Sequence, residues 1–186
     1  MSQPTPNVRD VQLHDLRFTP FIDAATIRER VQALGRVIST DYADKRPVLL
    51  GVLNGAFLFV ADLVRALNID CEVSFVKLRS YDGVATTGEV DTLLGLDTDL
   101  AGRHVLLVED IVDTGNTLHY FLPDLQRLKP ASVELAVLLL KPEALQRALT
   151  IKYLGFEIEN RFVVGYGLDY KELGRNLPAL YQLKND

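Results

Sequence analysis

The stretch "VLLVEDIVDTGNTLHY", Val105 to Tyr120, changes character twice within sixteen residues. An apolar run ends at two adjacent acids, Glu109 and Asp110, and a third acid, Asp113, precedes the residues Thr-Gly-Asn-Thr. The apolar run predicts a buried strand over His104–Val108, with the first two acids at its carboxyl end. The Thr-Gly-Asn-Thr segment then forms a turn that leads into a helix.

The order of strand, turn and helix recurs along the chain. Strands are expected over residues 47–53, 73–78, 104–108, 133–140 and 161–166, and helices over residues 27–42, 56–67 and 116–128. Near-continuous apolar strands that alternate with helices are typical of a mostly parallel sheet covered on both faces. We therefore expect an α/β fold in a single domain over residues 1–186, with ligands at the carboxyl ends of the strands.

Two polar segments interrupt this alternation. Residues 1–20 carry three of the eight prolines and show little periodicity, which predicts an extended N-terminal arm. Either Asp23 or Thr26 is expected to cap the first helix, and Thr26 with Glu29 fits a capping box. Residues 80–92 are polar and contain two glycines, which predicts a mobile loop that closes as a lid.

The composition excludes several classes of protein. No apolar run approaches the roughly 18 residues of a membrane span, so no membrane association is expected. The net charge of -5 and the absence of a basic run argue against nucleic-acid binding. The N-terminus lacks the pattern of a signal peptide, and the single cysteine, Cys71, has no disulfide partner within the chain. These features indicate a cytoplasmic protein.

The opening stretch also predicts the chemistry of the ligand. A helix N-terminus that follows glycine and hydroxyl residues can bind a phosphate through its unsatisfied N–H groups. The turn is not a Walker A loop, because Gly-x4-Gly-Lys-Ser/Thr is absent. Glu109 and Asp110 cannot favour a phosphate directly, whereas sugar hydroxyls or Mg²⁺ suit carboxylates. A phosphorylated sugar is therefore the expected ligand.

Several segments together resemble a known family. "VLLVEDIVDTGNTL" resembles the phosphoribosyl-diphosphate motif of type I phosphoribosyltransferases. With "GVLNGAFLFVADL", "SFVKLRSYDG", "LLLKPEAL" and "GFEIENRFVVGYGLDYKELGRNL", it follows the order and approximate spacing of hypoxanthine-guanine phosphoribosyltransferases. The resemblance runs from about residue 12 to the C-terminus. It implies a type I phosphoribosyltransferase fold with a small hood built from terminal segments, and a homodimer or homotetramer.

The resemblance also implies a reaction and its small-molecule substrates. Phosphoribosyl diphosphate would react with hypoxanthine or guanine, with Mg²⁺ as cofactor, to give IMP or GMP and pyrophosphate. In the matching positions, Glu109 and Asp110 hold the ribose hydroxyls, and with Asp169 they are the expected metal ligands. The phosphoribosyl group is bound further by Asp113, Thr114, Gly115, Asn116 and Thr117. Asp113 also resembles the catalytic acid beside the purine's N7, where it accepts a proton as the purine attacks.

Other positions match the purine and pyrophosphate sites. The resemblance places Lys141 at the purine's O6, Phe162 as the stacking ring, and Val163 and Asp169 at the purine edge. It assigns pyrophosphate to Arg175 and to the loop of Leu53, Asn54 and Gly55, with a cis peptide between the first two. Ser80 and Tyr81 match the start of the catalytic loop. Many family members have a basic residue in place of Asn54, and many have lysine in place of Asn116.

Structural alternatives remain for individual residues. Asp113 could only cap the following helix, Lys141 could be a solvated lysine at a strand end, and Phe162 could belong to the core. Asp169 could cap a turn, and Arg175 could be an ordinary surface arginine. Two functional alternatives also stay open. One is a xanthine-preferring or broad 6-oxopurine phosphoribosyltransferase, and the other is a non-catalytic nucleotide-sensing regulator on the same fold.

Overall fold

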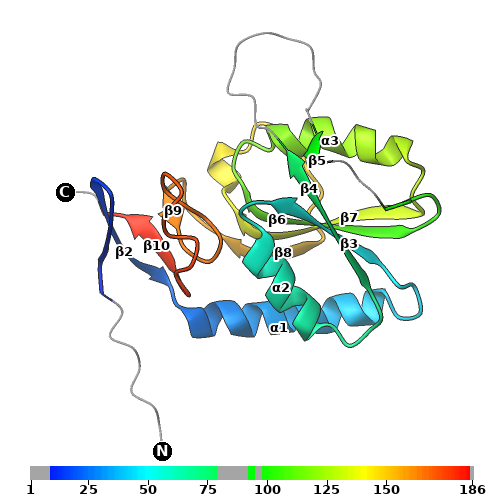
Figure 1. The fold of residues 1–186 in the computed structure, drawn as a ribbon, viewed down its shortest axis with the longest axis horizontal. Coiled ribbons are helices and arrows are strands. Elements are labelled where there is room, and N and C mark those ends of the chain that lie inside the picture. The colour runs from blue at the N-terminus through cyan, green and yellow to red at the C-terminus, as the bar shows by residue number, and fades with distance from the viewer. Residues whose placement is uncertain (1–8, 79–91, 95–97, 185–186) are drawn as a thin grey trace, which may run out of the picture.

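Two β-sheets organise the chain in the computed structural model, which describes residues 9–78, 92–94 and 98–184 (Figure 1). The larger sheet has the strand order β5-β4-β3-β6-β7-β8. Its strands are β3 (Val48–Leu53), β4 (Glu72–Leu78), β5 (Thr92–Leu94), β6 (His104–Val112), β7 (Ser132–Leu140) and β8 (Tyr153–Glu157). All neighbours pair in parallel except β5, which runs antiparallel to β4. The mostly parallel central sheet is therefore confirmed.

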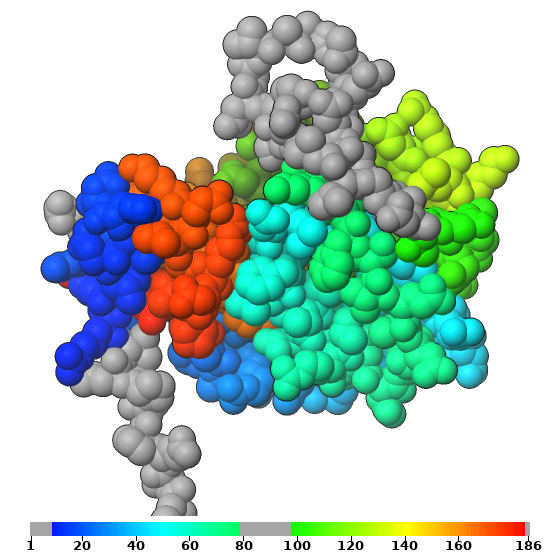
Figure 2. Space-filling model, viewed as in Figure 1, coloured from blue at the N-terminus to red at the C-terminus, as the bar shows by residue number. Residues whose placement is uncertain are grey.

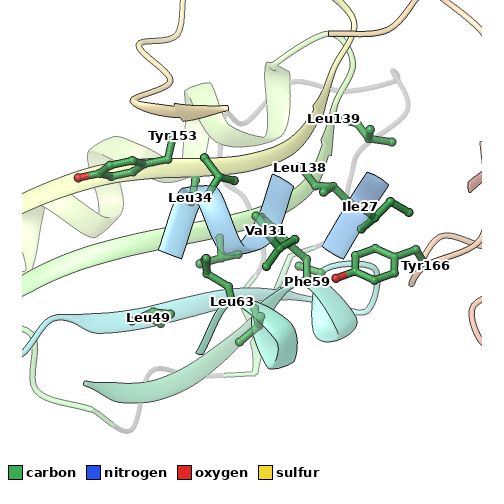
Figure 3. Close-up of a cluster of buried hydrophobic side chains, with 14 of the residues drawn as sticks. Ile27, Val31, Leu34, Leu49, Phe59, Leu63, Leu138, Leu139, Tyr153 and Tyr166 are labelled. Atoms are coloured by element: carbon green, nitrogen blue, oxygen red, sulfur yellow. The ribbon is translucent and has the colours of Figure 1, made fainter. Parts of the chain in front are cut away.

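Helices cover both faces of this sheet. The helices α1 (Ala24–Asp41) and α2 (Phe57–Ala66) contact each other and pack on one face, whereas α3 (Asn116–Arg127) packs on the other (Figure 1). Figure 3 shows the core under α1 and α2, where Ile27, Val31 and Leu34 meet Phe59 and Leu63. No helix in the described ranges is long and apolar enough to cross a membrane.

Asp23 is the residue that caps α1. Its carboxylate accepts hydrogen bonds from the backbone N and the hydroxyl of Thr26, at 2.8 and 2.9 Å. Thr26 is thus a donor inside the first turn, and the predicted capping box between Thr26 and Glu29 is wrong. Asp23 is the N-cap because strand β2 ends at Ile22 and α1 begins at Ala24, which leaves Asp23 as the one residue between them.

The second sheet forms a small hood beside the larger sheet and its helices (Figure 2). It is antiparallel, with the order β1-β2-β10-β9, and consists of β1 (Val11–Leu13), β2 (Leu16–Ile22), β9 (Val163–Val164) and β10 (Leu180–Leu183). A separate apolar cluster around Phe18 and Tyr181 forms its core. The expected hood of terminal segments is therefore confirmed.

Two predictions for these terminal segments are wrong. The extended arm is expected over residues 1–20, but residues 11–22 form the β1–β2 hairpin, in which β1 pairs with β2 and β2 pairs with β10 from far along the chain. The strand expected over 161–166 shrinks to Val163–Val164 and joins the hood. The last parallel strand is instead β8.

Strand β6 continues further than expected. Its pairing with β7 extends to Ile111 opposite Leu139 and Val112 opposite Leu140, so the strand ends at Val112 and not at Val108. Glu109 and Asp110 consequently lie inside the C-terminal half of β6, and Asp113 is the first residue after the strand. The long β7 partner keeps this segment extended and fixes the direction of the acids.

Candidate active site

The carboxyl ends of β3, β6 and β7 meet at one edge of the parallel sheet and collect most of the expected site residues. The loop after β3 lies directly against β6, because a Cβ added to Gly55 would overlap the carboxylate of Asp110. The peptide between Leu53 and Asn54 in this loop is cis, as expected. A side chain at Gly55 would therefore displace the acid beside it.

Glu109 and Asp110 form an acidic pair enclosed by protein. Burial, together with the nearby Asp110, raises the pKa of Glu109 well above its usual range. Burial also raises the pKa of Asp110 to about 6, partly offset by backbone hydrogen bonds and by Arg175. One carboxyl oxygen of Glu109, Oε2, is buried without a hydrogen-bond partner in the described part of the chain. The pair therefore favours a ligand that donates hydrogen bonds or carries positive charge.

Asp113 and Lys141 form a direct ion pair at the ends of β6 and β7. The Nζ atom of Lys141 lies 2.6 Å from Oδ2 of Asp113. The register explains the contact, because each residue follows one member of the Val112–Leu140 pair, and the Lys141 N–H donates to the Val112 carbonyl. Lys141 is only 7% exposed, so it is not a solvated surface lysine. The buried ammonium therefore has this carboxylate as its charged partner.

The Thr114–Thr117 turn leads into α3 as the sequence predicts. Gly115 is the N-cap of α3, adopts the left-handed conformation with φ 78°, and provides no side-chain hydrogen bond. Asp113 therefore does not cap the helix. The Thr114 hydroxyl accepts from the Asn116 N–H at 3.3 Å, and the other N–H groups of the first turn are available to an anion.

Asp169 and Arg175 occur together in the segment between β9 and β10. Arg175 Nη2 lies 2.7 Å from Oδ1 of Asp169, and its Nη1 donates to the Gly167 carbonyl. The other Asp169 oxygen accepts from the backbone N of Glu172 at 2.8 Å, so the turn-capping alternative also holds. Gly167 packs on the Gly55 carbonyl with no space for a Cβ, which places this segment beside the β3 loop.

Phe162 and Val163 differ sharply in exposure. Phe162 is 44% exposed, whereas Val163 is buried in the hood. Behind Phe162 lie the rings of Phe18 and Tyr170, at centroid distances of 6.0 and 5.8 Å. Phe162 thus presents an open ring face on an aromatic support, and it is not a core residue.

The carboxylates of the site are spaced as separate donors. In the described ranges, no three His, Cys, Asp or Glu side chains converge as a preformed metal site. Magnesium commonly takes only one or two protein carboxylates and completes its shell with substrate oxygens and water. The orphaned oxygen of Glu109 and the raised pKa of Asp110 fit such a cation, while Asp169 is held by Arg175.

Some site contacts were missed by sequence reasoning, and some predictions fall outside the structure. The side chain of Arg147 donates to Asn116 at 3.1 Å, and Phe18 supports Phe162. Neither contact leaves a local signal, because each joins segments that are distant in sequence. Ser80 and Tyr81, with the rest of the predicted 80–92 loop before Thr92, lie outside the described residues.

Comparison with known proteins gives a consistent result. The family described as phosphoribosyl transferase domain matches residues 24–171. The hypoxanthine-guanine phosphoribosyltransferase of Dictyostelium discoideum is 42% identical over 165 residues, which cover 86% of this chain and 92% of that protein.

Solved structures agree with this match. A hypoxanthine phosphoribosyltransferase from Staphylococcus aureus has a TM-score of 0.85 and 37% identity, covering 89% of this chain and 90% of the other. A Trypanosoma cruzi hypoxanthine phosphoribosyl transferase, solved to study the role of its C-terminal region in oligomeric state and enzymatic activity, has a TM-score of 0.84 and 36% identity. The superposition covers 94% of this chain and 95% of the Trypanosoma cruzi chain.

Proposed function

The chain belongs to the phosphoribosyltransferase family, and from this membership we propose that it transfers the 5-phosphoribosyl group of phosphoribosyl diphosphate to N9 of hypoxanthine or guanine. The products are IMP or GMP and pyrophosphate, so the protein is a purine-salvage glycosyltransferase. Relatives of nearly the same length with this activity support the assignment, because the chain covers most of each one.

One observation supports this function above the others. A helix N-terminus without a charged cap, an enclosed acidic pair and the Asp113–Lys141 ion pair lie together at the ends of adjacent strands β6 and β7. A phosphate, a sugar diol and a heterocycle with an acceptor oxygen are the three ligand parts that these groups suit. A 5-phosphoribosyl group joined to a 6-oxopurine contains all three.

In this proposal, Glu109 and Asp110 bind the two ribose hydroxyls. Each hydroxyl donates a hydrogen bond to a carboxyl oxygen, which gives the orphaned Oε2 of Glu109 a partner. As pyrophosphate leaves, positive charge develops on the ribose carbon, and fixed carboxylates beside the ring stabilise it. Glu109, Asp110 or Asp169 would hold Mg²⁺ together with substrate oxygens, and the bound ion would supply positive charge beside the pyrophosphate group.

The purine is placed against Phe162 and Lys141. The exposed Phe162 ring stacks on the base, and the Lys141 ammonium donates to O6 while its other protons keep Asp113 in place. Asp113 then accepts the proton from N7 as N9 attacks the ribose carbon. Adenine has an amino group at position 6, so it would leave the Lys141 donor without an acceptor.

The remaining groups bind the two phosphate ends. The amides of Thr114–Thr117 bind the 5-phosphate, and pyrophosphate lies between Arg175 and the amides of the Leu53–Gly55 loop. Arg175 and Asp169 already form an ion pair at 2.7 Å. Pyrophosphate binding therefore requires the Arg175 guanidinium to donate to Asp169 and to the ligand at the same time. A planar fork of donors can do this without losing the carboxylate.

The assembly and location of the protein are further parts of the proposal. We propose a homodimer or homotetramer, since a related structure was determined in a study of oligomeric state. Light scattering of the purified protein would give the mass directly. The cytoplasmic location expected from the sequence stays a prediction, which cell fractionation would check.

A direct assay tests the proposed reaction. The protein is mixed with phosphoribosyl diphosphate, Mg²⁺ and, in turn, hypoxanthine, guanine, xanthine or adenine, and nucleotide formation is followed by absorbance. Turnover of hypoxanthine or guanine, with little for adenine and none after chelation by EDTA, is the expected result. Preferred turnover of xanthine would make the protein a xanthine-preferring phosphoribosyltransferase. Binding of nucleotide without turnover of any purine would favour a non-catalytic regulator.

A further inference from the structure

The segment after β7 folds back over the phosphate turn, Thr114–Thr117, where the proposed function places the 5-phosphate. Beyond the short 3-10 helix Pro142–Ala144, the N–H of Gln146 donates to the Thr114 carbonyl at 3.0 Å. The side chains of Leu145 and Leu149 both lie against Gly115, each 3.1 Å from the position of an added Cβ. The segment and the turn are therefore held together by backbone and apolar contacts on either side of residue 147.

This packing places a cation at the start of α3. The Nε atom of Arg147 donates to Oδ1 of Asn116, the first residue of the helix, at 3.1 Å. Using Nε leaves the two terminal nitrogens of the guanidinium to face other acceptors. Among the described residues, no other lysine or arginine hydrogen-bonds to residues 114–117.

The Arg147 guanidinium lies at an electrostatically unfavourable place unless an anion is bound there. The N-terminus of a helix carries a partial positive charge, so a cation there is disfavoured unless a negative group lies between them. α3 has no acidic residue in its first turn and no side-chain cap, so the described residues of that turn supply no such group. A phosphate at this turn would accept from both the helix amides and the guanidinium.

We propose that Arg147 binds the 5-phosphate of the phosphoribosyl group and that Asn116 orients its guanidinium through Nε. The inference rests on the proposed function, since it takes the phosphate turn as the site of that group. Arg147 supplies the charge that backbone amides alone do not carry, and it reaches the ligand from a segment outside the β6–α3 motif.

Nucleotide and nucleoside binding separate this role from a structural one. GMP and guanosine differ only in the 5-phosphate, so titration calorimetry with both ligands isolates the phosphate contact. For Arg147→Ala, affinity for GMP should fall about threefold to thirtyfold, as expected for an exposed charge-assisted hydrogen bond, while affinity for guanosine stays unchanged. Arg147→Lys should recover part of the loss, because the charge returns without the fork.

Arg127→Ala is a matched control. Arg127 is an exposed arginine at the other end of the same helix, paired with Asp124 at 2.6 Å, so its loss should affect neither ligand. In turnover assays, Arg147→Ala should raise KM for phosphoribosyl diphosphate and leave KM for the purine unchanged. Non-additive losses in a cycle with Asn116→Ala would support the orienting role of that residue.

The other outcomes are distinct. Equal losses of GMP and guanosine would make Arg147 a structural residue, and affinities equal to those of Arg127→Ala would exclude any phosphate contact. Either result overturns the inference while the proposed function stands. A wild-type protein that binds neither GMP nor phosphoribosyl diphosphate would refute the proposed function, and the Arg147 contact with it.

Discussion

The enclosed carboxyl group of Asp110 should destabilise the ligand-free protein once it ionises. Its pKa in the folded protein is about 6, compared with an ordinary value of 3.8. At about 1.4 kcal/mol per pKa unit, this rise corresponds to about 3 kcal/mol. The residue as a whole is only half-buried, and solvent screens a partly exposed charge, so about 1–3 kcal/mol is expected.

The sign of the effect follows from proton binding. Between pH 4 and pH 6 the folded protein retains a proton on Asp110 that the unfolded chain has lost, so the free energy of unfolding decreases as pH rises through this window. Below pH 4 both states are protonated and the penalty is absent. Asp110→Asn keeps the shape of the side chain without the charge, so it should be more stable than the wild type by about 1–3 kcal/mol at pH 8.

Urea unfolding followed by circular dichroism measures this difference. Both proteins are unfolded in EDTA, without substrates, at several pH values from about 4.5 to 8. The stability advantage of Asp110→Asn should grow with pH and level off above about pH 7. Asp124→Asn, at an exposed acid on α3, is the control and should show no such growth. A wild type as stable as Asp110→Asn at pH 8 would refute the argument from burial.

Three further substitutions give separate outcomes. Asp113→Asn should lower kcat about 10²-fold to 10⁴-fold while calorimetric affinity for phosphoribosyl diphosphate changes little; loss of that affinity would mean a mainly structural residue. Gly55→Ala should push the Asp110 carboxylate aside, reducing kcat/KM for phosphoribosyl diphosphate at least about tenfold and stability by about 1–3 kcal/mol, and unchanged kinetics would contradict the close contact. Asp23→Ala should cost about 1 kcal/mol, seen as a fall in Tm of roughly 2–4 °C, with kcat unaffected; an unaltered Tm would show that the cap contributes nothing.

The central motif could be predicted from sequence because its signals are local. Apolar continuity marked β6 and β7, and glycine with hydroxyl residues marked the turn before α3. Parallel strands bring their carboxyl ends to one edge, so the proximity of Asp113 and Lys141 follows from that topology.

The missed elements depend on long-range pairing. Strands β1 and β10 are only 3 and 4 residues long, and β9 has 2, so none offers enough periodicity to be identified alone. Strand β8, "YLGFE", contains a glycine, and only glycine fits there because the Leu138 carbonyl of β7 occupies the space of a Cβ, a constraint that comes from a distant segment. Likewise, the position of Arg147 is fixed by a loop that packs across the helix start, which no local pattern encodes.

The hood joins the two ends of the chain, which has a consequence for biosynthesis. Strand β2 is synthesised long before its partner β10, so the hood sheet cannot close until β10 has left the ribosome. The main sheet, with local strand–helix units, can fold before then. A nascent chain stalled before residue 180 would therefore have a folded α/β core beside an incomplete hood, so the aromatic contact between Phe18 and Phe162 would not yet be held by the closed sheet.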